Sequence, residues 1–223
     1  MEIIGKKVNF LGDSITEGSG VTDIQNCRYD NRLRERFSLV TNNYGIGGTR
    51  LAHQSTVSEK PRWDLCFCGR AYNLDKSADL TVVYGGVNDY LHGDAPFGEE
   101  GDTTPATFVG AVYFLMNLLR TEYPTQDIVF MTPARCCFYG GDYRTPSLHP
   151  NKRPDARPLM DYVRVIEDTA KKFSIPVLNL YERLPIDPAK EEDNVRFTSD
   201  GLHFNDEGHA ILADLLQEFL LAL

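Results

Sequence analysis

A serine that follows a short apolar run is the first residue in this chain whose setting suggests chemistry. Residues 8–11 (VNFL) are mostly apolar and stop at Gly12, which is typical of a buried strand that ends in a turn. Ser14 therefore follows the carboxyl end of this strand, the edge of an open α/β sheet where ligands bind. Its hydroxyl can act as a nucleophile once a base removes its proton. The alternative is that Asp13 and Ser14 only cap the next helix.

A base and an acid at a suitable spacing occur near the other end of the sequence. Asp200 precedes His203 by three residues. In a turn, this spacing lets the carboxylate bind one ring nitrogen while the other nitrogen faces Ser14. We therefore predict that Ser14 is the nucleophile, that His203 is the general base and that Asp200 orients it. The alternatives are a surface histidine at position 203 and a helix cap at position 200.

Two glycine-rich turns between these ends supply hydrogen-bond donors. Residues 43–49 (NYGIGGT) and 85–89 (GGVND) each follow a strand-like segment. The N–H of Gly48, the side-chain amide of Asn88 and the N–H of Ser14 are suited to hold an oxyanion. The alternatives are a turn glycine with a positive φ at position 48 and a loop-capping asparagine at position 88.

The four stretches, in this order, resemble the motif blocks of the SGNH hydrolases, also called the GDSL esterase/lipase family. The matching blocks are Gly12-Asp13-Ser14 for the nucleophile, Gly48, Gly86-Val87-Asn88-Asp89, and Asp200 with His203. Isoleucine at position 15 replaces the leucine of the GDSL motif. The resemblance spans residues 8–209. It implies a flavodoxin-like α/β fold and a serine esterase that works through an acyl-enzyme, with no cofactor and no metal.

The composition limits the classes of partner and compartment. The chain has 223 residues and a formal net charge of −9. This length suits one domain over residues 1–223, and the acidic balance argues against binding to nucleic acid or to an anionic membrane surface. The first residues lack the apolar core of a secretory signal, and the five cysteines are odd in number, so we expect a cytoplasmic protein.

Apolar runs and amphipathic stretches alternate along the chain. This alternation predicts an α/β/α sandwich of three layers with a five-stranded parallel sheet. The expected strands are 8–11, 38–41, 80–84, 128–131 and 177–180. The expected helices are 29–37, 66–75, a helix capped by Thr104 with Pro105 at its first position, 159–170 and one from Asn205. Two long loops, 90–104 and 135–158, should lie at the same edge as Ser14.

Side chains near the predicted site suggest a substrate class. We predict substrate contacts by Asp13, Asp89, Tyr90, Phe138 and Tyr139, although the two aspartates could instead fix their turns and the aromatic rings could simply pack the loops. Aromatic faces rimmed by polar groups suit a sugar or a short acyl chain. The first hypothesis is a hydrolase of short-chain esters, plausibly acetyl esters of carbohydrates. The alternatives are a lysophospholipase or acyl thioesterase, and a non-catalytic binding module. Self-association into a homo-oligomer stays open.

The other histidines compete poorly with His203 as the base. We expect His53, His92 and His149 to be weak competitors, since His53 and His149 have no acid three residues earlier. His209 follows Asp206 by three on the final predicted helix, where we expect a surface contact. A metal site built from Asp200, His203 and His209 lacks the helical His-Glu-x-x-His arrangement. We therefore predict no metal.

Overall fold

Five parallel strands form one sheet in the order β2-β1-β3-β4-β5. The computed structural model describes residues 1–138, 140–150, 152 and 156–223. The strands are β1 (Lys7–Gly12), β2 (Val40–Gly45), β3 (Leu80–Tyr84), β4 (Asp127–Met131) and β5 (Val177–Leu178). Each strand pairs in parallel with its neighbours. The predicted five-stranded parallel sheet is confirmed.

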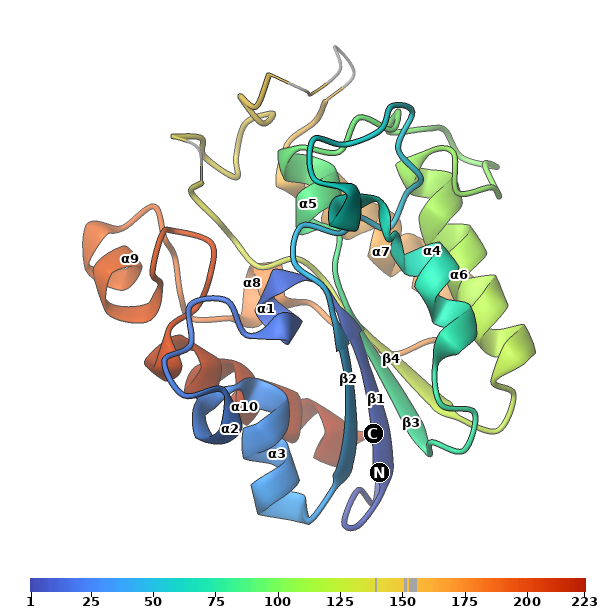
Figure 1. Ribbon diagram of the computed structural model, residues 1–223, viewed down its shortest axis with the longest axis vertical. Helices are drawn as coiled ribbons and strands as arrows, with labels where there is room; N and C mark the ends of the chain where they lie inside the picture. The colour runs from blue at the N-terminus through green and yellow to red at the C-terminus, as the bar shows by residue number, and fades with distance from the viewer. Residues whose placement is uncertain (139, 151, 153–155) are drawn as a thin grey trace.

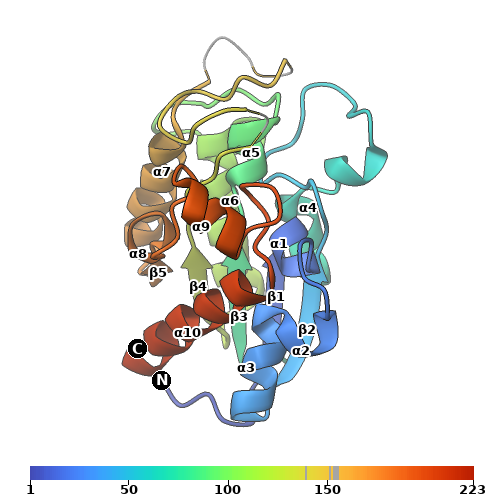
Figure 2. The same cartoon turned by 90° about the vertical axis from the view of Figure 1, so that its left-hand side faces the viewer.

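Helices cover both faces of the sheet, which confirms the three predicted layers (Figures 1 and 2). The helices on one side are α2 (Ile24–Cys27), α3 (Tyr29–Phe37) and α10 (Asp206–Ala222). The helices on the other side are α4 (Phe67–Arg70), α6 (Phe108–Glu122) and α7 (Leu159–Lys172).

Alternate side chains of each strand point into two separate cores, because successive residues of a strand face opposite sides. Phe10 and Val82 pack in the core that contains α10 residue Leu212. Leu11 and Val83 pack in the core that contains α6 residue Leu115. The central strands are therefore buried on both faces, as their continuous apolar sequences predict.

Short helices occupy the carboxyl ends of the strands and the segments that follow them. These are α1 (Ser14–Glu17), η1 (Pro61–Asp64), η2 (Ala71–Asn73), α5 (Val87–Leu91), α8 (Leu180–Arg183) and α9 (Glu191–Phe197). In Figure 1, α1 and α5 lie just beyond the upper ends of the strands. The turns after β1, β2 and β3 therefore lie together at the edge formed by the carboxyl ends of the strands.

Several predicted boundaries are wrong. Ser38 ends α3 with a left-handed φ of 53°, so β2 starts at Val40 and not at residue 38. The helix expected from Thr104 starts at Phe108, because the Thr107 hydroxyl accepts the Gly110 N–H at 3.1 Å and acts as the cap. Asn179 caps α8, so the fifth strand ends before it.

The loop expected from Tyr90 starts later, because Tyr90 belongs to α5. The helix expected over 66–75 is a single turn, α4, followed by η2. Within the described ranges, every helix is too short or too polar to span a lipid bilayer.

Candidate active site

The turn after β1 presents Ser14 as the first residue of α1. Asp13 caps this helix, since its carboxylate accepts the Ile15 N–H at 3.0 Å. Asp13 is fully buried, and burial raises the pKa of its carboxyl group to about 6. Asp13 therefore holds the turn in place from inside the protein. The side chain of Ser14 instead faces His203.

The turn before α10 brings an imidazole and a carboxylate to Ser14. The Oγ of Ser14 lies 2.9 Å from Nε2 of His203, and Nδ1 of His203 lies 2.7 Å from Oδ2 of Asp200. The other oxygen of Asp200 accepts the N–H groups of His203 at 2.8 Å and Leu202 at 3.0 Å. The three side chains form one continuous chain of hydrogen bonds, and the backbone of the turn fixes the carboxylate.

The state of Asp200 decides which nitrogen of His203 carries the hydrogen. Burial raises the pKa of Asp200, but hydrogen bonds from the His203 ring and backbone outweigh burial and keep the pKa below its usual range. An ionised carboxylate only accepts hydrogen bonds, so Nδ1 of His203 is the donor to it. The lone pair of Nε2 then faces the Ser14 hydroxyl, which is the arrangement that a general base needs.

Two backbone N–H groups beside Ser14 are available to a ligand. Gly47 donates to the Glu17 carboxylate at 2.7 Å, whereas the N–H groups of Gly48 and Ser14 have no hydrogen-bond partner in the described part of the chain. Gly48 has a φ of 77°, and a Cβ there would lie 2.0 Å from Nε1 of Trp63. Only glycine fits this turn.

Asn88 adds a side-chain donor from the turn after β3. Its Nδ2 donates to the carbonyl of Thr49 at 3.0 Å, and its Oδ1 lies 3.1 Å from Nε2 of His92. An amide nitrogen carries two hydrogens, so Nδ2 can make one further hydrogen bond. Ser14, Gly48 and Asn88 all line one cavity and can together hold an oxyanion.

Asp89 ties α5 to the segment that follows Gly48. Its carboxylate accepts the N–H groups of Leu51 at 2.8 Å and Ala52 at 3.0 Å. Burial raises the pKa of Asp89 to about 6. Arg70 braces the same region, since it donates to the Gly12 carbonyl at 3.0 Å and to the Thr49 hydroxyl at 2.9 Å. The side chains of Asp89 and Arg70 therefore fix the turns around the cavity at Ser14 but do not line it.

The cavity at Ser14 has a volume of about 300 Å³. Its lining includes Ser14, Gly48, Asn88 and His203. It also includes several residues that sequence reasoning missed, namely Glu17, Ser19, Lys60, Arg62, Trp63, His92 and Leu202. Trp63 is the only tryptophan of the chain and follows Lys60 and Arg62, which is the one signal that could have pointed to it. Its ring lies 4.7 Å from that of His92.

The five predicted substrate contacts have different outcomes. Phe138 lines the cavity, with its ring 5.9 Å from the ring of His203. Asp13, Asp89 and Tyr90 are buried and do not line it, because they bond to the protein itself. The Tyr90 hydroxyl donates to the carbonyls of Asp142 and Thr145. The structure therefore gives these three residues hydrogen bonds within the protein and does not place them at the cavity, and Tyr139 lies outside the described residues.

His209 is a buried residue and not the predicted surface contact. It is fully buried and stacks on Tyr29, whose N–H donates to Nδ1 at 3.3 Å. Asp206 instead accepts the N–H of Thr22 at 2.9 Å. Burial lowers the pKa of His209 to about 4. His209 therefore stays neutral inside the protein at neutral pH.

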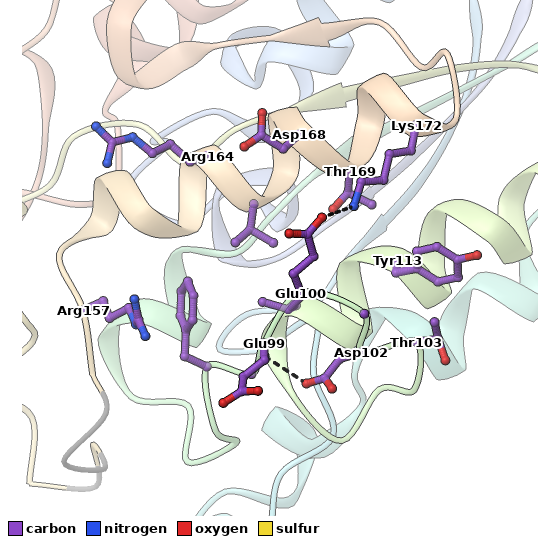
Figure 3. A pocket seen from close by; sticks show the side chains of 15 residues that line it. Glu99, Glu100, Asp102, Thr103, Tyr113, Arg157, Arg164, Asp168, Thr169 and Lys172 are labelled. Carbon is purple, nitrogen blue, oxygen red and sulfur yellow. Dashed lines mark hydrogen bonds and ion pairs between the residues drawn. The ribbon is translucent and has the colours of Figure 1, made fainter.

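A larger cavity of about 610 Å³ lies between the 97–103 loop, α6 and α7 (Figure 3). Two of its charged side chains, Lys172 and Glu100, form an ion pair at 3.2 Å. It shares no lining residue with the cavity at Ser14. The reactive side chains thus gather at the smaller cavity.

The chain is similar to known proteins in sequence and in fold. The model of the GDSL-like Lipase/Acylhydrolase family matches residues 10–211. No curated protein matches the chain.

Several solved structures share the fold. A protein from Lactobacillus plantarum is 28% identical with a TM-score of 0.83, over 99% of this chain and 98% of that one. A possible lipase from Chitinophaga pinensis is 21% identical with a TM-score of 0.67, over 96% of each chain. A two-domain esterase active on acetylated mannans is 21% identical with a TM-score of 0.62, over 98% of this chain and 49% of that one.

Proposed function

The chain belongs to the GDSL-like lipase/acylhydrolase family, and we propose that it hydrolyses short-chain carboxylic esters, above all acetyl esters of carbohydrates. The observation that carries this proposal is the chain of hydrogen bonds from Asp200 through His203 to Ser14, with distances of 2.7 and 2.9 Å. A hydroxyl held in this way beside unpaired donors is arranged for acyl transfer.

The reaction proceeds in two steps through an acyl-enzyme. Ser14 Oγ attacks the ester carbonyl carbon while Nε2 of His203 takes the hydroxyl proton, and Ser14 N–H, Gly48 N–H and Asn88 Nδ2 hold the oxyanion. The intermediate collapses, and His203 gives the proton to the departing alcohol. Water then attacks the acyl group with His203 again as base, which releases the carboxylic acid and restores Ser14.

The size and lining of the cavity support a small acyl group and a polar alcohol. The cavity of about 300 Å³ has Glu17, Lys60 and Arg62 in its lining. Trp63 and His92 also line a neighbouring cavity of about 350 Å³ whose other lining residues are mostly polar or charged. An aromatic face between polar side chains suits a sugar ring. The relative that acts on acetylated mannans supports the same class of substrate.

A chain-length series tests the proposal. We expect kcat/KM for p-nitrophenyl esters to be highest with acetate and to fall steeply beyond butyrate, and we expect release of acetate from an acetylated sugar. Ser14→Ala should lower kcat by about 10⁴-fold or more, because the nucleophile is lost. Ser77→Ala, which removes an exposed hydroxyl at the amino end of β3, is the control.

Other outcomes would contradict the proposal in distinct ways. Cleavage that stays fast with octanoate and palmitate esters would favour a lysophospholipase or a thioesterase. If hydrolysis does not depend on Ser14, or if no ester is hydrolysed, a binding module on this fold would be favoured.

A further inference from the structure

A short chain of hydrogen bonds runs behind the proposed oxyanion hole. The Nη1 of Arg50 lies 3.1 Å from Nδ1 of His92, and Nε2 of His92 lies 3.1 Å from Oδ1 of Asn88. All three residues are buried, with exposed fractions of 2%, 5% and 3%. We propose that His92, oriented by Arg50, is a positioning residue that fixes the Asn88 amide so that its N–H points at the oxyanion. This inference rests on the proposed ester hydrolysis.

The partner on each ring nitrogen sets the tautomer of His92. A guanidinium can only donate, so Nδ1 of His92 must accept from Arg50. The ring hydrogen is then on Nε2, and this N–H donates to the carbonyl oxygen of Asn88. Burial, followed by the charges of Arg50, His149 and Lys152, lowers the pKa of His92 to about 3, so the ring remains neutral at neutral pH.

The tautomer in turn decides which way the Asn88 amide faces. With Oδ1 on His92, Nδ2 donates to the Thr49 carbonyl at 3.0 Å and keeps its second hydrogen. If the amide rotated by half a turn, its NH₂ group would meet the N–H of His92, and its oxygen would meet the carbonyl of Thr49. Both contacts would be repulsive, so two partners of opposite polarity hold one orientation.

Arg50, at the far end of this series of hydrogen bonds, is also held in place. Nη2 of Arg50 donates to the Asp64 carboxylate at 2.8 Å and to the Ser58 hydroxyl. Because the positive charge of Arg50 lies at one end, it polarises His92 and makes the N–H of Asn88 a stronger donor. The ring of His92 also packs on Trp63 at 4.7 Å, so its position is held by contact as well as by hydrogen bonds.

Two substitutions separate hydrogen bonding from packing. His92→Phe keeps a ring against Trp63 but cannot donate to Asn88. The amide nitrogen of His92→Gln reaches about as far as Nε2 of histidine and can donate. With p-nitrophenyl acetate, we expect His92→Phe to lower kcat by about tenfold or more with little change in KM, and His92→Gln to recover most of that loss. His53→Gln changes an exposed histidine and is the control.

A double-mutant cycle shows whether His92 acts through Asn88. Asn88→Ala should lower kcat by about 10²–10³-fold. If His92 only orients that amide, the Asn88→Ala/His92→Phe protein should be about as slow as Asn88→Ala alone. Effects that multiply, an unchanged kcat in His92→Phe, or equal losses in the Phe and Gln variants would overturn the inference. An unchanged kcat in Ser14→Ala would instead overturn the proposed function.

Nitrogen NMR of the histidine rings provides a test that does not depend on activity. The ¹⁵N signals of His92, assigned through the spectrum of His92→Gln, should show a neutral ring with its hydrogen on Nε2 at pH 7. A neutral ring with its hydrogen on Nδ1, or a charged ring, would contradict the proposed positioning even if the enzyme were fully active.

Discussion

At the scale of single residues, each reactive group has one partner that fixes its chemical state. Asp200 fixes the hydrogen on Nδ1 of His203, and this leaves Nε2 for Ser14 at 2.9 Å. The contact between Asp200 and His203 could be predicted from their spacing, because both residues belong to one short turn. His92 lies only four residues after Asn88, but Thr49, which accepts from Asn88, and Arg50, which orients His92, come from a distant segment. The role of His92 could therefore not be predicted from its neighbours in the sequence.

Gly48 gives the sharpest residue-scale prediction. Gly48→Ala puts a Cβ 2.0 Å from Nε1 of Trp63 at a φ of 77°, which is strained for alanine, so the Trp63 ring or the peptide that carries the proposed oxyanion donor must shift. We expect kcat/KM to fall by about tenfold or more, because a displaced donor stabilises the transition state less. The measurement is the steady-state hydrolysis of p-nitrophenyl acetate, with urea unfolding alongside.

A matched control exists in Gly5, which has a similar φ of 71° but nothing within 4 Å of an added Cβ. Gly5→Ala should lose about 1 kcal/mol of stability through backbone strain and keep its activity. Equal activities in Gly48→Ala and in the unchanged protein would remove Gly48 from the oxyanion hole.

At the scale of elements, the strands with continuous apolar sequences were predictable and the polar ones were not. β3 and β4 are buried on both faces, so their composition alone identifies them. β2 lies at the edge of the sheet and contains Asn42 and Asn43, which make hydrogen bonds to the side chains of neighbouring segments. Its sequence therefore resembles a loop, and the prediction placed the strand too early.

Competing caps explain another error. Thr104 followed by Pro105 is a typical start of a helix, but in the structure Thr107, three residues later, is the cap. Thr107 is favoured as the cap because its hydroxyl also donates to the Asp102 carboxylate at 2.8 Å. This contact depends on how the preceding loop folds. Similarly, Trp63 and Arg62 come from a segment without periodicity, and only the folded chain places them beside Ser14.

At the scale of the whole molecule, packing of α10 against α3 encloses an ionisable side chain. His209 faces Tyr29 on one side and Phe204 on another. Its Nε2 has no partner among the described residues. The amphipathic pattern of the final helix did not distinguish this buried histidine from a surface one, because histidine is common in both settings.

The lowered pKa of His209 predicts a loss of stability in acid. The unfolded state binds a proton below about pH 6.5, whereas the folded state does so only near its pKa of about 4. The unfolding free energy should therefore fall as the pH drops from 6.5 to 4, by at most about 1.4 kcal/mol per unit from this group. His209→Gln should remove that part of the slope in urea titrations, and His53→Gln should not. Parallel curves for His209→Gln and the unchanged protein would show that His209 is not the cause.

Covalent labelling of Ser14 tests the central claim most directly. A fluorophosphonate reacts with a serine oxygen that a base has activated, forms an O–P bond and releases fluoride. Peptide mass spectrometry should find one adduct per chain, on Ser14, with none in Ser14→Ala and much slower labelling in His203→Ala. An adduct on another residue, or labelling of Ser14 at an unchanged rate without His203, would contradict the account.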